Sequence, residues 1–197
     1  VGRIIETLRS VRKQKKIFLF LIAFFFFIDG VYTIIDMATA YGSALGLDST
    51  GLLLALLVTQ FVAFPFSILF GRLAEKYDTG KLILTCIAAY MGITVFAVFM
   101  KAQWQFWVLA IFVGMFQGGI QALSRSYFAK IVPPERSGEY FGLMDICGKG
   151  ASFMGTTVVG LASQAFGSIN IGISAIVFLF LAGALFFMKT EHSGSES

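Results

Sequence analysis

The chain has 197 residues, of which 57% are hydrophobic and only 13% are charged, with 23 phenylalanines. Soluble domains carry about 25% charged residues, so this composition excludes an ordinary soluble domain and indicates an integral membrane protein. The net charge of +4 does not indicate nucleic-acid binding, because the basic residues form short clusters between apolar runs, a pattern that orients membrane proteins.

Residues 1–16 (VGRIIETLRSVRKQKK) are basic and amphipathic, and we interpret them as a cytoplasmic linker. The chain begins with valine, and we expect it to be part of a longer protein. Six apolar stretches follow, each long enough to cross a bilayer as a helix. Their approximate ranges are 17–43, 50–71, 82–100, 103–125, 140–166 and 170–188.

The stretch from residue 150 to 188 carries no charge and is too long for one crossing, so we divide it at FGSIN, residues 166–170. The sequence therefore predicts an all-α membrane protein with a six-span domain over residues 17–190 and a disordered cytoplasmic tail over residues 191–197. With the N-terminus in the cytoplasm, almost all basic residues outside the spans face inward and only Lys101 faces outward, which places both termini in the cytoplasm. The short loops favour a bacterial inner membrane over a vacuole.

Two carboxylates lie within the first span. Asp29 and Asp36 are seven residues apart, close to two helical turns, so they share one helix face with Tyr32 and Thr33. A charge inside a span costs at least about 2.5–3.5 kcal/mol and needs a reason. We expect this face to line a watery cavity or another helix, with the phenylalanines directed at lipid. Alternatively the aspartates only accept hydrogen bonds from neighbouring helices, and Asp36 lies near enough to the outer surface to be solvated.

The fifth span carries Asp145 and Lys149, at a spacing that favours an ion pair within one helix. This pair either only balances charge or releases one member when a solute or proton arrives.

The fourth span carries Gln117, Gln121 and Arg125 on one face, and Gln60 of the second span is a weaker case of the same kind. These glutamines either bind a polar solute or join helices by hydrogen bonds. We interpret Arg125, near the cytoplasmic end, mainly as a basic anchor.

Small residues in the fourth span predict close packing against another helix, since Gly114 and Gly118 form a GxxxG pattern. Cys86 and Cys147 have no second cysteine or histidine at ligand spacing, so we expect no disulfide, metal or cofactor. The spans contain no histidine, and neither cysteine has a base nearby in sequence, so we do not expect an enzyme.

The loop after the second span has the sequence GRLAEKYDTGKLIL, residues 71–84. Its spacing of glycine, acid, glycine and basic residue resembles the signature loop of the major facilitator superfamily. It departs from that signature in Glu75 instead of Asp, an inserted Asp78-Thr79, and a single basic residue after Gly80. The stretches FIDGVYTIIDMATAYG and GGIQALSRSYFAKIVPPERSGEYFGLMDICGKGASFMG resemble the second half of transporters in the vacuolar amino-acid effluxer branch of that superfamily.

This resemblance implies twelve spans in two halves, each half made of two inverted three-helix repeats, with the substrate near the midplane between the halves. It implies transport of a small polar solute, such as an amino acid, by alternating access. The candidate substrate or proton residues are Asp29, Tyr32, Asp36, Gln60, Gln117, Gln121, Asp145 and Lys149. The resemblance also implies a cytoplasmic gate in which Glu75 pairs with a basic group or a helix N-terminus. The candidate gate residues are Gly71, Arg72, Glu75, Gly80, Lys81, Arg125, Arg136 and Glu139.

The expected partners are the lipid bilayer, a small polar solute, and either an N-terminal six-helix half or a second copy of this chain, with no nucleic acid. The second-copy alternative makes the chain a six-helix assembly module that forms a homodimer without transport of its own.

Overall fold

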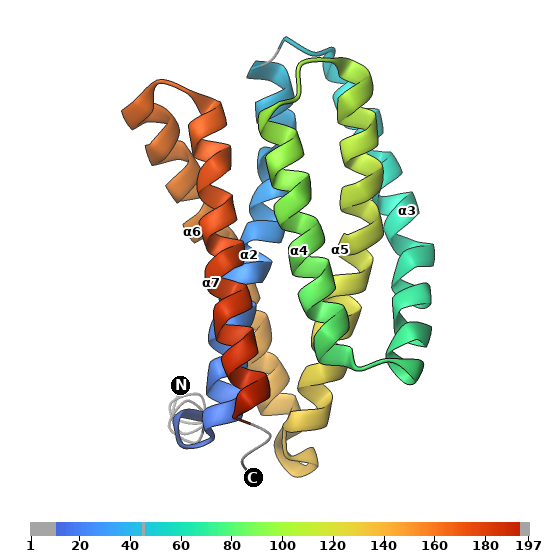
Figure 1. Ribbon diagram of the computed structural model, residues 1–197, viewed down its shortest axis with the longest axis vertical. Helices are drawn as coiled ribbons and strands as arrows, with labels where there is room; N and C mark the ends of the chain where they lie inside the picture. The colour runs from blue at the N-terminus through green and yellow to red at the C-terminus, as the bar shows by residue number, and fades with distance from the viewer. Residues whose placement is uncertain (1–10, 45, 194–197) are drawn as a thin grey trace.

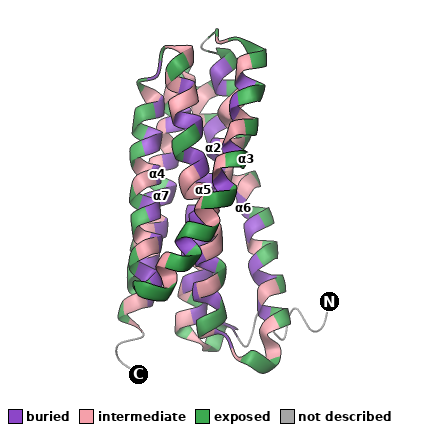
Figure 2. Cartoon of the chain, turned by 90° about the vertical axis from the view of Figure 1, so that its right-hand side faces the viewer, coloured by how far each residue is buried: buried purple, intermediate pink, exposed green. Residues whose placement is uncertain are grey.

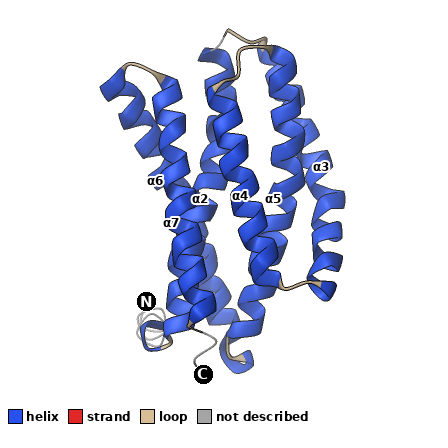
Figure 3. Ribbon diagram, viewed as in Figure 1, coloured by secondary structure: helices blue, strands red, loops and turns tan. Residues whose placement is uncertain are grey.

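The computed structural model describes residues 11–44 and 46–193, and within these residues every regular element is helical (Figure 3). The helices are α2 (Lys15–Ala44), α3 (Ser49–Lys76), α4 (Thr79–Val98), α5 (Gln103–Ile131), α6 (Ser137–Phe166) and α7 (Ile169–His192), with a short 3-10 helix η1 (Pro134–Arg136). The all-α prediction is confirmed. Residues 1–10 of the expected linker and 194–197 of the expected tail lie outside the described residues.

Local sequence signals set the helix boundaries. The side chain of Asp48 accepts a hydrogen bond from Gly51 N at 2.7 Å before α3, and that of Asp78 accepts one from Lys81 N at 2.9 Å before α4. Both are N-caps, which satisfy backbone donors that the first helical turn leaves unpaired. The inserted Asp78 of the signature-like loop therefore starts α4. Gly167, with φ 66°, separates α6 from α7 within the predicted break.

The six long helices run side by side and alternate in direction (Figure 1). α3 packs mainly on α5, α2 packs mainly on α7 and α6, and α4 joins the two groups through α5 and α7. Buried residues make up 61% of the most apolar window of α2 but only 17% of that of α3, so α2 is central and α3 peripheral (Figure 2).

The centre of the bundle contains aromatic rings that we expected at the lipid surface. Phe20 of α2 is fully buried, and its ring centroid lies 5.2 Å from that of Tyr127 and 5.3 Å from that of Phe128, both on α5. Phe24 and Phe27 are also buried. The expectation that the phenylalanines of α2 face lipid is wrong for these three, because α2 is enclosed by helices and its aromatic side chains supply the core contacts.

The predicted glycine contact in the fourth span is confirmed. A Cβ atom on Gly114 would lie 2.6 Å from the carbonyl oxygen of Thr59, and one on Gly118 would overlap the carbonyl oxygen of Ala63. Only glycine lets the backbones of α5 and α3 approach this closely.

Five helices, α2, α3, α4, α5 and α7, are long and apolar enough to cross a membrane. α6 has the length but not the apolar character, since it carries Glu139, Asp145 and Lys149 together with many Gly, Ser and Thr residues. The described residues therefore form an all-α membrane protein with five candidate spans and one more polar helix.

Candidate functional site

A polar cavity lies where α2, α5 and α6 meet. Its volume is about 120 Å³, and its lining includes the polar side chains of Tyr32 from α2, Gln121 and Arg125 from α5, and Asp145 and Lys149 from α6. Phe24, Ile28, Met144 and Gly148 complete the wall. The structure thus brings together five of the residues that the sequence singled out, from the first, fourth and fifth predicted spans.

The carboxylate of Asp145 pairs with Arg125 across two helices. The distance from Arg125 Nη2 to Asp145 Oδ1 is 2.9 Å, and about half of each side chain is exposed. The sequence predicted a pair between Asp145 and Lys149 instead, and that prediction is wrong. Among the described residues no acidic side chain lies within ion-pair distance of Lys149. Spacing along one helix could not reveal that a longer arginine side chain reaches across from α5.

The interpretation of Arg125 mainly as a basic anchor also needs correction, because its guanidinium group is bonded to Asp145 at the cavity. Charge-assisted hydrogen bonds of this kind orient both partners. Because about half of each side chain is exposed, the pair contributes little to folding stability, about 0–1 kcal/mol. The arrangement therefore leaves Arg125 available to exchange Asp145 for another anion.

Asp29 lies behind this cavity and not in its wall. It is fully buried, and its Oδ1 accepts hydrogen bonds from Gly155 N at 2.8 Å and from Thr33 Oγ1 at 3.4 Å. Its Oδ2 is buried with no hydrogen-bond partner among the described residues. A Cβ atom on Gly155 would overlap the oxygens of Thr33 and Asp29. In this structure Asp29 therefore joins α2 to α6 as a hydrogen-bond acceptor.

Three other predicted site residues do not line the cavity. Asp36 is exposed on α2 beyond Tyr32, which agrees with the solvated alternative, and Gln60 is exposed on α3. Gln117 is half-buried, and its Oε1 is buried with no hydrogen-bond partner among the described residues. A helix-face pattern places a residue on one side of a helix but does not tell how close the neighbouring helix comes.

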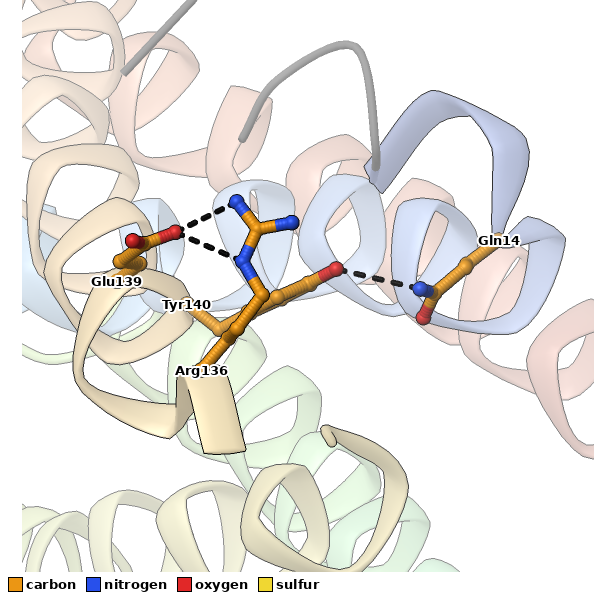
Figure 4. Close-up of polar contacts among 4 residues, drawn as sticks. All are labelled: Gln14, Arg136, Glu139 and Tyr140. Atoms are coloured by element: carbon orange, nitrogen blue, oxygen red, sulfur yellow. Dashed lines mark hydrogen bonds and ion pairs between the residues drawn. The ribbon is translucent and has the colours of Figure 1, made fainter. Parts of the chain in front are cut away.

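The predicted gate residues are distributed over the ends of several helices. Gly71, Arg72, Glu75 and Lys81 are exposed, whereas Gly80 is buried. Arg136 forms an ion pair with Glu139 at 2.7 Å at the start of α6 (Figure 4). Arg125 pairs with Asp145, so the structure does not bring Glu75 to either of these two arginines.

An acidic residue that we assigned to the disordered tail lies in this region instead. α7 continues through Glu191, whose carboxylate accepts a hydrogen bond from the hydroxyl of Tyr127 on α5. A Cβ atom on Gly80 would lie 2.7 Å from Glu191 Oε2, so the carboxylate sits beside the N-terminus of α4, where a negative charge is favourable. The tail prediction is wrong for Glu191 and His192. The only sequence signal was an isolated acid just after the last apolar stretch.

Residues 1–196 match the model of a family described as vacuole effluxer Atg22 like. The chain belongs to this Atg22-like family. The resemblance found in the sequence is thereby confirmed.

Relatives of the Atg22-like chain have transporter or autophagy-related names. It is 46% identical to the uncharacterized MFS-type transporter YxiO of Bacillus subtilis, over 99% of this chain and 46% of that protein. It is 26% identical to autophagy-related protein 22 of Cryptococcus neoformans, over 92% of this chain and 35% of the relative. It is 29% identical to autophagy-related protein 22 of Saccharomyces cerevisiae, over 81% of this chain and 32% of that protein. The chain thus spans less than half the length of these relatives, and its family is one of transporters and not of enzymes.

Proposed function

We propose that this chain is one half of a secondary transporter that moves a small polar solute, an amino acid, across a membrane by alternating access. One observation carries the proposal: the cavity that gathers Tyr32, Gln121, Arg125, Asp145 and Lys149 from three helices. Ionisable groups within membrane helices are costly and mark solute or proton pathways. The family supports a transport role, since its description is that of an effluxer.

The helix contacts support two inverted three-helix repeats, α2–α4 and α5–α7. In these repeats α2 corresponds to α5, α3 to α6, and α4 to α7. The contact of α3 with α5 then corresponds to that of α6 with α2, and the contact of α2 with α7 to that of α5 with α4. Exchanging the two repeats therefore maps these contacts onto each other, as expected for half of a transporter with internal repeats. The symmetry is not complete, since α6 also packs on α7 and, within the described residues, α3 makes no comparable contact with α4. In this proposal α6 is the fifth of six spans despite its polar residues, because Asp145 and Lys149 line the cavity.

The charges of the cavity suit a solute that carries a carboxylate. Arg125 and Lys149 supply two positive charges and Asp145 one negative charge. Of the two cations, only Arg125 has an acidic partner among the described residues. An amino acid could place its carboxylate between Arg125 and Lys149 and its ammonium group near Asp145. Binding would then separate Asp145 from Arg125, which links the presence of the solute to the contact between α5 and α6.

We also propose that both termini are cytoplasmic, that the membrane is a bacterial inner membrane, and that Glu75 and the other gate residues close the cytoplasmic side in another conformation. Residues 1–16 would be the linker to an N-terminal half. A proton role for Asp29 and Asp145 belongs to the same proposal. It would be wrong if Asp29→Asn and Asp145→Asn both left transport and its pH dependence unchanged.

The decisive experiment measures amino-acid transport by the full protein in proteoliposomes. We expect Arg125→Gln and Asp145→Asn each to reduce transport at least about tenfold, because each removes a charged group at the binding cavity. The free energy of unfolding of each variant should differ from that of the native protein by no more than about 1 kcal/mol, as expected for a half-exposed ion pair. The matched control is Lys101→Gln, which removes a charge from the opposite end of the bundle and should leave transport unchanged. Normal transport in both cavity variants would refute the proposed site.

A second candidate function is a homodimeric assembly module without transport. It is compatible with the exposed apolar side chains of α3, among them Leu53, Leu57, Phe61 and Phe64, which lipid, another half or a second copy would cover. Mass measurement in detergent distinguishes the candidates, since a strict monomer excludes the homodimer.

A further inference from the structure

A second, apolar cavity lies on the flank of the bundle between α6, the first half of α2 and the residues just before α2. We call it the flank groove. Its volume is about 560 Å³, and its walls include Phe18, Leu21 and Phe25 of α2 and Leu143 and Cys147 of α6. It shares no lining residue with the polar cavity, so the flank groove is separate from the site proposed for the transported solute.

One end of the flank groove is strongly positive. Arg12 is part of the lining, and Lys13, Lys15 and Lys16 follow it within four residues. No acidic residue occurs between Val11 and Asp29, and Arg12 and Lys13 are exposed. The groove therefore combines an apolar wall at the depth of the membrane helices with a cluster of cations at the helix start.

This cationic end is fixed in place. Val11 is buried, and Gln14 Nε2 donates a hydrogen bond to the hydroxyl of Tyr140 on α6 at 3.2 Å (Figure 4). Gln14 N also donates to Val11 O at 2.9 Å, and Phe18 N donates to Gln14 O at 3.0 Å. These contacts hold Arg12 beside α6, at the mouth of the groove.

We propose that the flank groove binds an anionic phospholipid from the leaflet at this end of the bundle. One acyl chain would lie along Phe18, Leu21 and Phe25, and the phosphate would lie against Arg12 and the neighbouring lysines. Acyl chains fill any apolar groove at hydrocarbon depth, so the selectivity must come from the headgroup. Basic pockets at the membrane surface bind anionic headgroups, and long basic side chains reach that level easily. The proposal does not depend on the proposed transport function.

The native cysteines provide a test. Cys147 lines the flank groove and is half-buried, whereas Cys86 is buried in the core. The rate at which N-ethylmaleimide modifies Cys147 would be measured by intact mass on the full chain in non-ionic detergent. Dioleoyl phosphatidylglycerol or dioleoyl phosphatidylcholine would be added at equal mole fraction. We expect phosphatidylglycerol to slow the modification at least about fivefold and phosphatidylcholine less than about twofold, because only the former pairs with the cations.

The double variant Arg12→Ala/Lys13→Ala should abolish the difference between the two lipids. The matched control Lys76→Ala/Lys81→Ala removes two exposed cations from α3 and α4, which do not line the groove, and should preserve the difference. Native mass spectrometry of the same samples should detect more retained phosphatidylglycerol than phosphatidylcholine, and this second measurement does not depend on the reactivity of Cys147.

Three results would overturn the proposal. The first is equal protection and equal retention with both lipids, which would mean an acyl-chain groove without headgroup preference. The second is unchanged selectivity in the Arg12→Ala/Lys13→Ala variant. The third is slow modification without lipid that becomes fast when residues 1–10 are deleted, which would mean that those residues occupy the groove.

Discussion

At the level of single residues, Asp29 and Gly155 form the tightest polar contact between α2 and α6. The carboxylate is fully buried, and one of its oxygens accepts the backbone N–H of Gly155. This contact exists because Gly155 has no side chain to keep the helices apart. Burying a carboxylate whose second oxygen has no hydrogen-bond partner costs free energy. The hydrogen bond from Gly155 N offsets part of this cost, and it forms only if α6 comes this close to α2.

We predict that Gly155→Ala destabilises the folded protein by about 1–3 kcal/mol, the usual cost of an added methyl group in a tightly packed site. The measurement is thermal unfolding in detergent. Gly160→Ala is the matched control on the same helix, since a Cβ atom there meets nothing within 4 Å, and it should be neutral or stabilising. Equal behaviour of the two variants would contradict the close contact at Gly155.

Sequence reasoning found the members of the polar cavity but not their pairing. Tyr32, Gln121 and Asp145 could be found because polar residues in apolar spans stand out and helical spacing fixes their faces. The Arg125–Asp145 pair could not, because it depends on the distance between α5 and α6. The separation of Asp29 from the cavity depends in the same way on how closely α6 approaches α2.

At the level of helices, single hydroxyl groups join several elements at each end of the bundle. Tyr127 joins α5 to Glu191 of α7 at one end. At the other end, the buried hydroxyl of Tyr41 on α2 lies 2.6 Å from the carbonyl oxygen of Ala97 and 3.0 Å from Asn170 Oδ1. Tyr41 therefore connects α2 to the end of α4 and the start of α7.

We predict that Tyr41→Phe lowers the free energy of unfolding by about 0.5–1.5 kcal/mol, because it removes one buried hydrogen bond to the Ala97 carbonyl. That carbonyl keeps its backbone hydrogen bond from Met100 N, at 3.1 Å. Tyr77→Phe is the control. Tyr77 is exposed, so removing its hydroxyl group should change the free energy of unfolding little. Both variants can be compared by thermal unfolding in the same detergent. A Tyr41→Phe variant as stable as the control would show that water replaces the hydroxyl.

The positions of the helices followed closely from apolar stretches, but their ends did not. The second predicted span, 50–71, lies within Ser49–Lys76, and the fourth, 103–125, lies within Gln103–Ile131. The helices extend past the apolar residues because capping and turn residues end a helix, whereas hydropathy only marks the part that can lie in lipid. The predicted last span ended with the apolar residues at 188, so it did not include Glu191, which the helix does include.

At the level of the whole molecule, the number of crossings depends on α6. Its hydropathy is too low for a span by composition, yet its cavity-facing charges do not have to meet lipid. A hydropathy scale treats every residue of a helix as exposed to lipid, which is why it separates α6 from the other five helices.

If α6 crosses, the α4–α5 loop and the α6–α7 loop lie on the same side of the membrane. We predict that cysteines introduced by Lys101→Cys and Ser168→Cys react with a membrane-impermeant maleimide from one side, and Glu135→Cys reacts only from the other. Intact cells and inside-out vesicles provide the two directions of access. Reaction of Ser168→Cys from the side of Glu135→Cys would mean that α6 does not cross and would refute the six-span half.

The hydrogen bond between Gln14 and Tyr140 gives the chain a mechanical connection between its beginning and its polar cavity. Tyr140 stands on the same helix as Asp145, little more than one turn away, and a helix moves as a stiff rod over so short a length. Among the described residues, no hydrogen bond joins Gln14 to Arg125 on α5. In the proposed transporter, a pull on the residues before α2 would therefore act on Asp145 more than on Arg125. The distance between the two charges would change, and with it the affinity of the cavity for the solute.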